Sequence, residues 1–357
     1  MSQSKRIGLC TGGGDAPGLN AVIRAIVKYG HGQLGWSFLG IEECFHGLMY
    51  PETKRVWPLD LPSCQGLLSR GGTILGTTNR GDPFGRAPDG RLYAEIIRES
   101  YDRHNLDGLI LLGGDGTQKI GHRLSTEYGI PIVGVPKTID NDLESTDFTF
   151  GFWSAVDVAT DALDRLHTTA ESHDRVMILE VMGRTAGWIA LYAGLAGGAD
   201  CIALPEIPYD ADRFMAKILK RRDLGRHFTL VVVAEGATPA GSLGTESKSA
   251  RGAGEQLTQL LQDAFEKRAD DTEIRCTVLG HIQRGGSPIP FDRVLATRYG
   301  VKAVELVRDG RFGELVCLKG GEITSVPIAD VASAPREVAP DESLLDVARA
   351  VGIEFGG

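Results

Sequence analysis

Apolar residues occur along this chain in short, nearly continuous runs that end in glycines and polar residues. A strand that is covered on both faces shows such a run rather than a regular apolar and polar alternation. We therefore predict buried strands at residues 6–11, 108–112, 132–135, 176–179 and 276–279.

A longer segment has its apolar residues at spacings of four and three, which predicts a helix with one core-facing stripe. This helix is expected to begin at Gly151 and to end near Ala170. Its stripe consists of Phe152, Val156, Ala159, Leu163 and Leu166. We interpret the stripe as core rather than as a cofactor site, and the helix as the start of a second domain.

The alternation of strand and helix signals indicates an α/β fold with mostly parallel sheets. The chain has 357 residues, of which 42% are hydrophobic. That length and composition allow one large core or two medium cores, and two domains fit best.

The run at residues 108–112 ends in Gly-Gly-Asp-Gly-Thr at residues 113–117. Glycines let backbone N–H groups approach phosphate closely, and Thr117 can cap a helix whose N-terminus adds partial positive charge. Asp115 would be repelled by clustered phosphates without a divalent cation between them, so we interpret it as a Mg²⁺ site, direct or through water. The motif predicts an anion-binding turn.

A second polar segment, Pro-Lys-Thr-Ile-Asp-Asn-Asp, occupies residues 136–142 after the next strand signal. Phosphoryl transfer to an alcohol needs a group that accepts the hydroxyl proton and orients the attacking oxygen. We assign Asp140 to the proton, Asp142 to orientation of the hydroxyl or the metal, and Thr138 as an additional hydroxyl. Asn and Asp also bond to their own backbone in ordinary turns, but the nearby glycine-rich turn favours chemistry here.

The N-terminal strand signal is followed by three glycines at residues 12–14 and by a helix that we expect to reach about Gly30. Asp15 is a candidate cap of this helix, and Pro17 falls near its first turn. The segment lacks the Lys-Ser/Thr of a P-loop and the spacing of a dinucleotide-binding fingerprint. It is therefore a second phosphate turn of another kind.

The motif Gly-Gly-Asp-Gly-Thr is also similar to segments of NAD kinases and lipid kinases, so by itself it does not identify a substrate. Three further segments, Thr11–Asn20, Glu180–Arg184 and Leu279–Pro288, complete a set of five motifs in one order. Together they resemble the 6-phosphofructokinase family, from about Arg6 to about Asp309.

The resemblance implies the phosphofructokinase fold, with two Rossmann-like domains and an active-site cleft between them. It implies a phosphoryl-donor domain for ATP and Mg²⁺ at residues 1–151 plus about 283–335. The sugar-phosphate domain would then comprise residues 152–282 plus about 336–357.

The resemblance also implies the reaction, transfer of the γ-phosphoryl group of Mg-ATP to the 1-hydroxyl of fructose 6-phosphate. Residues implied in binding the donor are Gly13, Arg80, Gly114, Asp115, Gly116 and Thr117. Residues implied in binding the sugar phosphate are Thr138, Ile139, Asp140, Arg175, Met182, Gly183, Arg184, Glu235, Arg275, His281, Ile282, Gln283 and Arg284.

Arginine forks suit phosphate oxygens, which agrees with the arginines in these motifs. Arg184 would stabilise charge on the transferring phosphoryl group. Arg175 and Arg275 would reach in from a neighbouring subunit, which implies self-association, as a homotetramer with shared active sites.

Two residues bear on the choice of donor. In the family, the position of Gly116 is Gly in ATP enzymes and commonly Asp in pyrophosphate enzymes, where the carboxylate would repel a nucleotide α-phosphate. Lys137 is typical of pyrophosphate enzymes, yet Gly with Lys also resembles an ATP-dependent branch with plant and trypanosomatid members. We predict ATP and keep pyrophosphate as the alternative donor. A silent, sugar-phosphate-binding regulatory subunit is an alternative of another class.

The chain departs from the family at two places. Asn79 precedes Arg80, so the register of the arginine against the donor phosphates is shifted by one. At the effector positions of bacterial relatives, Arg24, Arg55 and Asp200 match, whereas His167 replaces an arginine and residues 221–226 replace a lysine-rich loop. An altered effector site and a solvated basic face are equal alternatives.

The remaining composition limits the function classes. A net charge of −9 argues against general nucleic-acid binding and requires local concentration of the basic residues. The six isolated cysteines, among them Cys10, Cys201 and Cys276 in strand-like runs, predict reduced core thiols. No run approaches membrane-spanning length and no apolar signal region begins the chain, so we expect a cytoplasmic protein. Residues 82–91 and 237–254 are predicted surface loops.

Overall fold

The computed structural model describes residues 4–241, 252–331 and 335–357. The chain divides into two compact units. The first unit contains residues 1–139, 143–154 and 284–334, and the second contains residues 140–142, 155–283 and 335–357. The chain thus passes between the units several times.

The first unit is built on a seven-stranded sheet in the order β11-β10-β5-β4-β1-β2-β3. The five strands from β10 to β2 are parallel, and antiparallel β11 and β3 form the edges. The strands are β1 (Arg6–Thr11), β2 (Ser37–Ile41), β3 (Val56–Leu59), β4 (Gly108–Gly113), β5 (Ile132–Pro136), β10 (Glu314–Lys319) and β11 (Glu322–Pro327).

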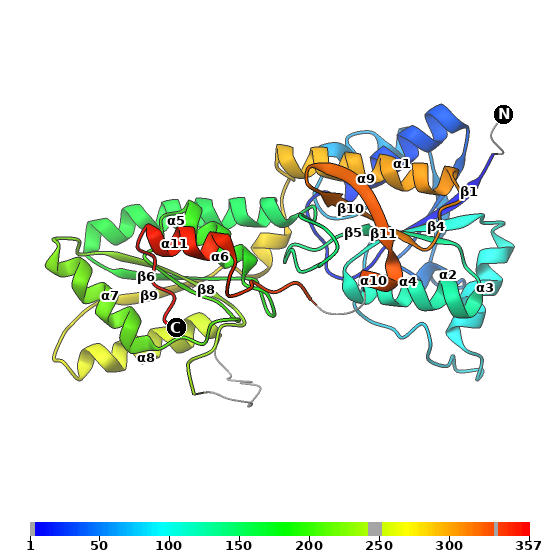
Figure 1. The fold of residues 1–357 in the computed structure, drawn as a ribbon. Coiled ribbons are helices and arrows are strands. Elements are labelled where there is room, and N and C mark those ends of the chain that lie inside the picture. The colour runs from blue at the N-terminus through cyan, green and yellow to red at the C-terminus, as the bar shows by residue number, and fades with distance from the viewer. Residues whose placement is uncertain (1–3, 242–251, 332–334) are drawn as a thin grey trace. The chain divides into compact units, whose positions relative to one another are not determined.

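Helices cover both faces of this sheet, which explains why its strands are continuously apolar. One face packs against α1 (Leu19–Leu34) and α9 (Pro290–Arg308), and alternate residues such as Ile110 and Leu112 point there. The other face, with Leu109 and Leu111, packs against the remaining helices (Figure 1). These are α2 (His46–Met49), α3 (Tyr93–Arg103), α4 (Asp115–Tyr128) and α10 (Ile328–Val331), and two short 3-10 turns lie at Pro62–Cys64 and Leu67–Ser69.

The second unit has a four-stranded, all-parallel sheet in the order β7-β8-β6-β9. Figure 1 shows α7 and α8 on one face of this sheet and α5, α6 and α11 on the other. The strands are β6 (Val176–Val181), β7 (Cys201–Ala203), β8 (Thr229–Ala234) and β9 (Ile274–Val278). The helices are α5 (Phe152–His173), α6 (Trp188–Ala196), α7 (Ala211–Asp223), α8 (Ala253–Glu266) and α11 (Ser343–Ala350), and a 3-10 turn, η3, spans Gly280–Arg284.

The structure confirms the α/β class with mostly parallel sheets and the five predicted strands, with shifted ends. It also confirms the stripe of α5, since Phe152, Val156, Ala159 and Leu163 are buried and Leu166 is partly buried. The prediction for residues 237–254 was wrong at its end, because Ala253 and Gly254 begin α8. Residues 242–251 of that segment lie outside the described residues.

Two predicted helix starts were wrong. Helix α1 begins at Leu19 with Gly18 as its N-cap, so Asp15 and Pro17 precede it. Gly18 has a φ of 112°, and a Cβ there would lie 2.8 Å from the ring of Phe150, so the backbone itself makes the sharp entry. Helix α4 begins at Asp115 with Gly114 as its N-cap, which places Thr117 inside the first turn instead of at the cap.

All six cysteines are free thiols, and each is buried except the half-exposed Cys276. In the part of the chain that the structure describes, no helix has both the length and the apolar character needed to span a bilayer.

Candidate active site

The first unit brings three of the predicted segments together at one edge of its sheet. Strands β5, β4 and β1 are neighbours and parallel, with Gly113 opposite Pro136 and Thr11 opposite Leu112. Their carboxyl ends therefore lie side by side, where open α/β sheets bind ligands. The segments that follow these strands are residues 12–14, 114–117 and 137–139. The structure thus places both glycine-rich turns beside the segment that leads to Asp140.

Thr117 joins the two glycine-rich turns. Its side chain lies against Gly12 and Gly113, and a Cβ on Gly12 would come within 2.8 Å of its hydroxyl oxygen. The N–H of Gly12 donates to the carbonyl of Leu112 at 2.9 Å, which holds the first turn to the end of β4. Both glycines are therefore required by close packing, and Thr117 is a packing residue as well as a candidate donor contact.

Two cations lie on the first glycine turn. Lys137, which is 3% exposed, donates from Nζ to the carbonyl of Gly14. The Arg284 Nη1 donates to the carbonyl of Asp15 at 3.2 Å. The ammonium of Lys137 also lies 3.2 Å from the position that a Cβ on Gly13 would take. Sequence reasoning assigned Arg284 to the sugar phosphate, whereas its guanidinium in this structure lies on the donor turn.

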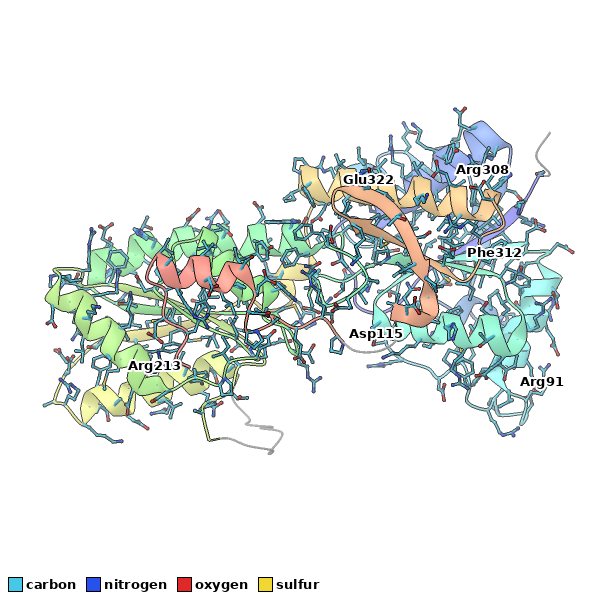
Figure 2. All side chains as sticks on the ribbon, viewed as in Figure 1. Arg91, Asp115, Arg213, Arg308, Phe312 and Glu322 are labelled. Carbon is cyan, nitrogen blue, oxygen red and sulfur yellow. The ribbon has the colours of Figure 1, made fainter. Side chains whose placement is uncertain are left out.

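The second glycine turn presents a carboxylate at a helix N-terminus. Asp115 begins α4, is about one-third exposed, and accepts from Lys119 Nζ at 2.7 Å (Figure 2). The next residue, Gly116, is exposed, and a Cβ there would meet nothing within 4 Å. The space above this turn is therefore open.

The donor set at this turn fits a magnesium ion that arrives with its phosphates. Mg²⁺ is usually held by one or two carboxylates and substrate phosphates rather than by a closed protein cage. Asp115 is one partly exposed carboxylate, and the described residues contain no group of three or more His, Cys, Asp or Glu side chains arranged for a metal.

A side chain that the sequence analysis did not assign also faces the first turn. The Oδ1 of Asn79 lies 3.9 Å from the position of a Cβ on Gly13, and the Gly13 N–H donates to the carbonyl of Thr78. Arg80 follows as an exposed residue whose own carbonyl contacts His46 Nε2 at 3.0 Å. In the sequence, the sign of this contact was that Asn79 precedes Arg80 and so shifts the arginine by one position.

The segment that carries Asp140 is held at both ends. Before it, the Lys137 N–H donates to the carbonyl of Gly113 at 3.1 Å, and Thr149 Oγ1 donates to the carbonyl of Thr138 at 2.7 Å. Ile139 is fully buried. After it, Asn141 adopts a φ of 53°, a left-handed conformation that Asn tolerates better than most residues.

After Asn141, the backbone is held by a hydrogen bond in which the Asp142 carbonyl accepts from the Arg336 N–H at 2.8 Å. The carboxylates of Asp140 and Asp142 belong to half-buried residues. A partly desolvated carboxylate on a fixed backbone suits an oriented proton acceptor.

The second unit gathers the other predicted residues at the carboxyl edge of its sheet. Met182, Gly183 and Arg184 follow β6, and Glu235 follows β8. The Glu235 N–H donates to the carbonyl of Val181 at 2.9 Å, which keeps the two strand ends together. Arg184 and Glu235 are exposed, whereas Met182 is 8% exposed.

The turn η3 follows β9 at the same carboxyl edge, and its residues differ in exposure. His281 and Ile282 are exposed. Gln283 is fully buried, accepts from the Met182 N–H at 2.7 Å and donates to the carbonyl of Ala155 at 3.3 Å. Gln283 therefore positions Met182 and the start of the second unit.

Arg175 and Arg275 lie at the opposite edge of this sheet, where β6 and β9 begin. One carboxylate holds both, because Glu273 accepts from Arg175 Nε at 2.6 Å and forms an ion pair with Arg275 through its other oxygen. Strand β6 has six residues, so the two edges are about 20 Å apart. Within one chain, these arginines and Arg184 cannot contact the same small ligand.

The buried carboxylate of Glu180 lies one residue before the carboxyl end of β6. It accepts from the Gly254 N–H at 2.8 Å, at the start of α8. Burial raises the pKa of Glu180, which the hydrogen bond from Gly254 partly opposes. Glu180 is thus a structural anchor of the strand that ends in Met182.

The residues considered for an effector site fall in both units. Arg24 and Arg55 belong to the first, and Arg55 stacks on Trp57 at 5.2 Å. Asp200 belongs to the second, where it pairs with Arg221 at 2.5 Å, and burial raises its pKa. The acid of the expected effector set is therefore engaged by a cation of its own unit.

These segments agree with what is known of related proteins. The family model for phosphofructokinase matches residues 6–307. The chain belongs to the phosphofructokinase family.

Curated relatives of this family match the whole chain. A protein of Chloroflexus aurantiacus named ATP-dependent 6-phosphofructokinase is 50% identical over 360 residues, which cover 99% of each chain. A protein of Streptomyces coelicolor named pyrophosphate–fructose 6-phosphate 1-phosphotransferase is 46% identical, over 98% of this chain and all of its own.

A solved family structure shares the fold. The phosphofructokinase of Pichia pastoris has a TM-score of 0.80 and 32% identity, covering 98% of this chain and 39% of that longer chain.

Proposed function

We propose that this protein is an ATP-dependent 6-phosphofructokinase. It transfers the γ-phosphoryl group of Mg-ATP to the 1-hydroxyl of fructose 6-phosphate, which gives fructose 1,6-bisphosphate and ADP in glycolysis. A glycolytic enzyme of this kind belongs in the cytoplasm. The observation that carries the proposal is the side-by-side placement of two glycine-rich turns and the segment leading to Asp140, with open space above Gly116.

The donor phosphates lie against the N–H groups of the two glycine-rich turns. Lys137 and Arg284 fix the first turn and add positive charge to it. Asp115 together with the donor phosphates would hold Mg²⁺, which when bound would neutralise phosphate charge. The nucleotide extends into the open space at Gly116, and a carboxylate at that position would repel it.

On the acceptor side, Asp140 accepts the proton of the sugar 1-hydroxyl and orients its oxygen, with Asp142 and Thr138 beside it. Arg184 stabilises the charge of the transferring phosphoryl group, and its exposed guanidinium pairs with no carboxylate in the described part of the chain. Met182, Gly183, Glu235 and the exposed η3 residues His281 and Ile282 contact the sugar phosphate.

The placement of Arg175 and Arg275 supports self-association, for which we propose a homotetramer. Both arginines lie at the sheet edge opposite Arg184, so they bind the 6-phosphate of a sugar held by a neighbouring subunit. Light scattering during size-exclusion chromatography measures the mass, and a monomer at working concentration would contradict this arrangement.

Pyrophosphate is the second candidate donor. Lys137 on the donor turn favours it, as does the relative named pyrophosphate–fructose 6-phosphate 1-phosphotransferase. Gly116 favours ATP, because the space that a nucleotide needs is open.

The purified protein, given fructose 6-phosphate and Mg²⁺ with either ATP or pyrophosphate, tests both the reaction and the donor. We expect fructose 1,6-bisphosphate with ATP alone. Product with pyrophosphate alone would reverse the choice of donor. Product with neither would favour a silent regulatory subunit or a different acceptor.

A further inference from the structure

A basic pocket lies in the second unit, between α7 and the chain that follows α11. Its volume is about 480 Å³. Helix α7 lines it with Arg213, Ala216, Lys217 and Lys220, which recur at spacings of three and four and so share one helical face. The other lining residues are Arg349, Gly352, Ile353 and Glu354. None of them is assigned to the proposed reaction.

The pocket carries four cations and one carboxylate. That carboxylate is engaged, because Glu354 Oε1 accepts from the Gly356 N–H at 2.9 Å and pairs with Arg213 at 3.2 Å. Lys217 donates to the carbonyl of Gly352 at 2.6 Å, which leaves two of its three N–H donors. An excess of positive charge therefore remains in the pocket.

The other two cations differ in their partners. Lys220 is exposed and pairs with no carboxylate among the residues described. Arg349, near the end of α11, pairs with Asp346 at 3.4 Å and lies over the ring of Phe355, so it keeps only part of its donor capacity. A guanidinium and an ammonium facing one cavity offer several charged donors to a single anion.

Helix stability explains only part of this arrangement. Basic residues such as Lys220 in the last turn of α7 interact favourably with the helix dipole. Arg213 is in the first turn, where a cation opposes the dipole, and like charges at Arg213 and Lys217 repel each other at a spacing of four. An anion in the pocket would offset both unfavourable terms.

We propose that this pocket binds a small phosphate monoester, at a site additional to those of the reaction. Its volume is in the range of small-ligand sites. A phosphate monoester near neutral pH has close to two negative charges and three acceptor oxygens, which match the charge and the remaining donors of the pocket.

Isothermal titration calorimetry of the full-length protein with 3-phosphoglycerate, at fixed ionic strength and without sugar phosphate, tests the site. The test variant is Lys220→Glu, since Lys220 is exposed and forms no ion pair within the part of the chain that the structure describes. Arg349→Gln is a second variant on the opposite wall. Lys267→Glu, with an exposed lysine at the end of α8, is the matched control.

We expect saturable binding that weakens by about tenfold in Lys220→Glu and by a smaller factor in Arg349→Gln, as for loss of a charge-assisted contact. Binding in Lys267→Glu should stay within about twofold of the starting protein. No saturable binding, or the same dissociation constant in all variants, would overturn the proposal. The readout is binding, so its outcome is independent of the proposed catalytic activity.

Discussion

The cations of the two units are held by different kinds of partner. In the first unit, Lys137 and Arg284 donate to backbone carbonyls of the glycine-rich turn. In the second unit, Arg175 and Arg275 pair with the carboxylate of Glu273. A carbonyl partner fixes the shape of a turn without cancelling the charge of the cation, whereas a carboxylate cancels it.

This difference indicates two ways of preparing for a phosphate. On the donor side, the positive charge and the N–H groups are already oriented, which removes reorganisation from the binding step. In the proposed reaction, the sugar phosphate displaces Glu273 on the acceptor side, because a phosphate has more charge and more acceptor oxygens than a carboxylate. Each side can be perturbed separately.

The largest effect is expected in the segment where the chain passes from one unit to the other. Asp140→Ser should lower kcat by about 10²-fold or more, because the hydroxyl loses its proton acceptor. Sugar-phosphate binding should remain nearly unchanged by calorimetry. Asp102→Ser, on the exposed side of α3, is the control. Undiminished turnover in Asp140→Ser would remove Asp140 from the mechanism.

A change at Gly116 tests the donor side alone. Gly116→Asp should raise the KM for ATP by about tenfold or more, since like charges brought together cost several kcal/mol. Binding of fructose 6-phosphate should be unaffected. Gly32→Asp is matched, because a Cβ at Gly32 also meets nothing within 4 Å. An unaltered KM for ATP would mean that the nucleotide does not use the space above Gly116.

Glu273→Gln tests the acceptor side. Arg175 holds the pKa of Glu273 below its ordinary value, so this group is charged at neutral pH. Removing the charge should lower the half-saturating concentration of fructose 6-phosphate by about threefold, because a competing anion is lost. Glu266→Gln, on exposed α8, serves for comparison. A higher half-saturating concentration would show that Glu273 orients the arginines instead of competing for them.

The smallest effect concerns Asp292, a buried carboxylate that pairs with no cation among the described residues. Asp292 accepts from the N–H and the hydroxyl of Ser154 at 2.7 and 2.6 Å, and burial raises the pKa of Asp292 to about 6. A raised pKa means that the proton stabilises the fold below the unfolded pKa, and this contribution is lost as pH rises through about 6.

Asp292→Asn should therefore change the pH dependence of stability in a defined direction. As the pH falls from 7 to 5, the melting temperature of the starting protein should rise by about 2 °C or more relative to that of the variant. Differential scanning fluorimetry across this range provides the measurement. A constant difference between the two proteins would show that Asp292 does not titrate there.

Much of this architecture was predictable from local sequence. Continuous apolar runs predicted five of the strands, because the strands of a parallel sheet covered on both faces need no polar side. The apolar stripe from Phe152 to Leu163 predicted α5, because one face of a helix packs against the core. The motifs at residues 113–117 and 136–142 indicated phosphoryl transfer, because glycines, a helix N-terminus and a carboxylate have few other uses together.

The positions of single side chains across the fold were less predictable. Asn79 lies beside the Gly13 turn although it is distant in sequence. Gln283, which we expected to bind the sugar phosphate, is fully buried and accepts from the Met182 N–H. Arg284 lies on the donor turn, although the residues just before it in sequence belong to the second unit. Such contacts depend on how strands are ordered in a sheet.

The sequence alone determined the class of fold, five of the strands, the helix after Gly151 and the family, and it predicted which residues carry the chemistry, since each follows from local pattern or motif. Only the tertiary structure decided which of those residues meet. It placed Lys137 on Gly14, put Glu273 between Arg175 and Arg275, and separated these two arginines from Arg184 by the length of β6. The physical reason is that strand order and strand direction bring together residues far apart in sequence, and neither is encoded in any single segment.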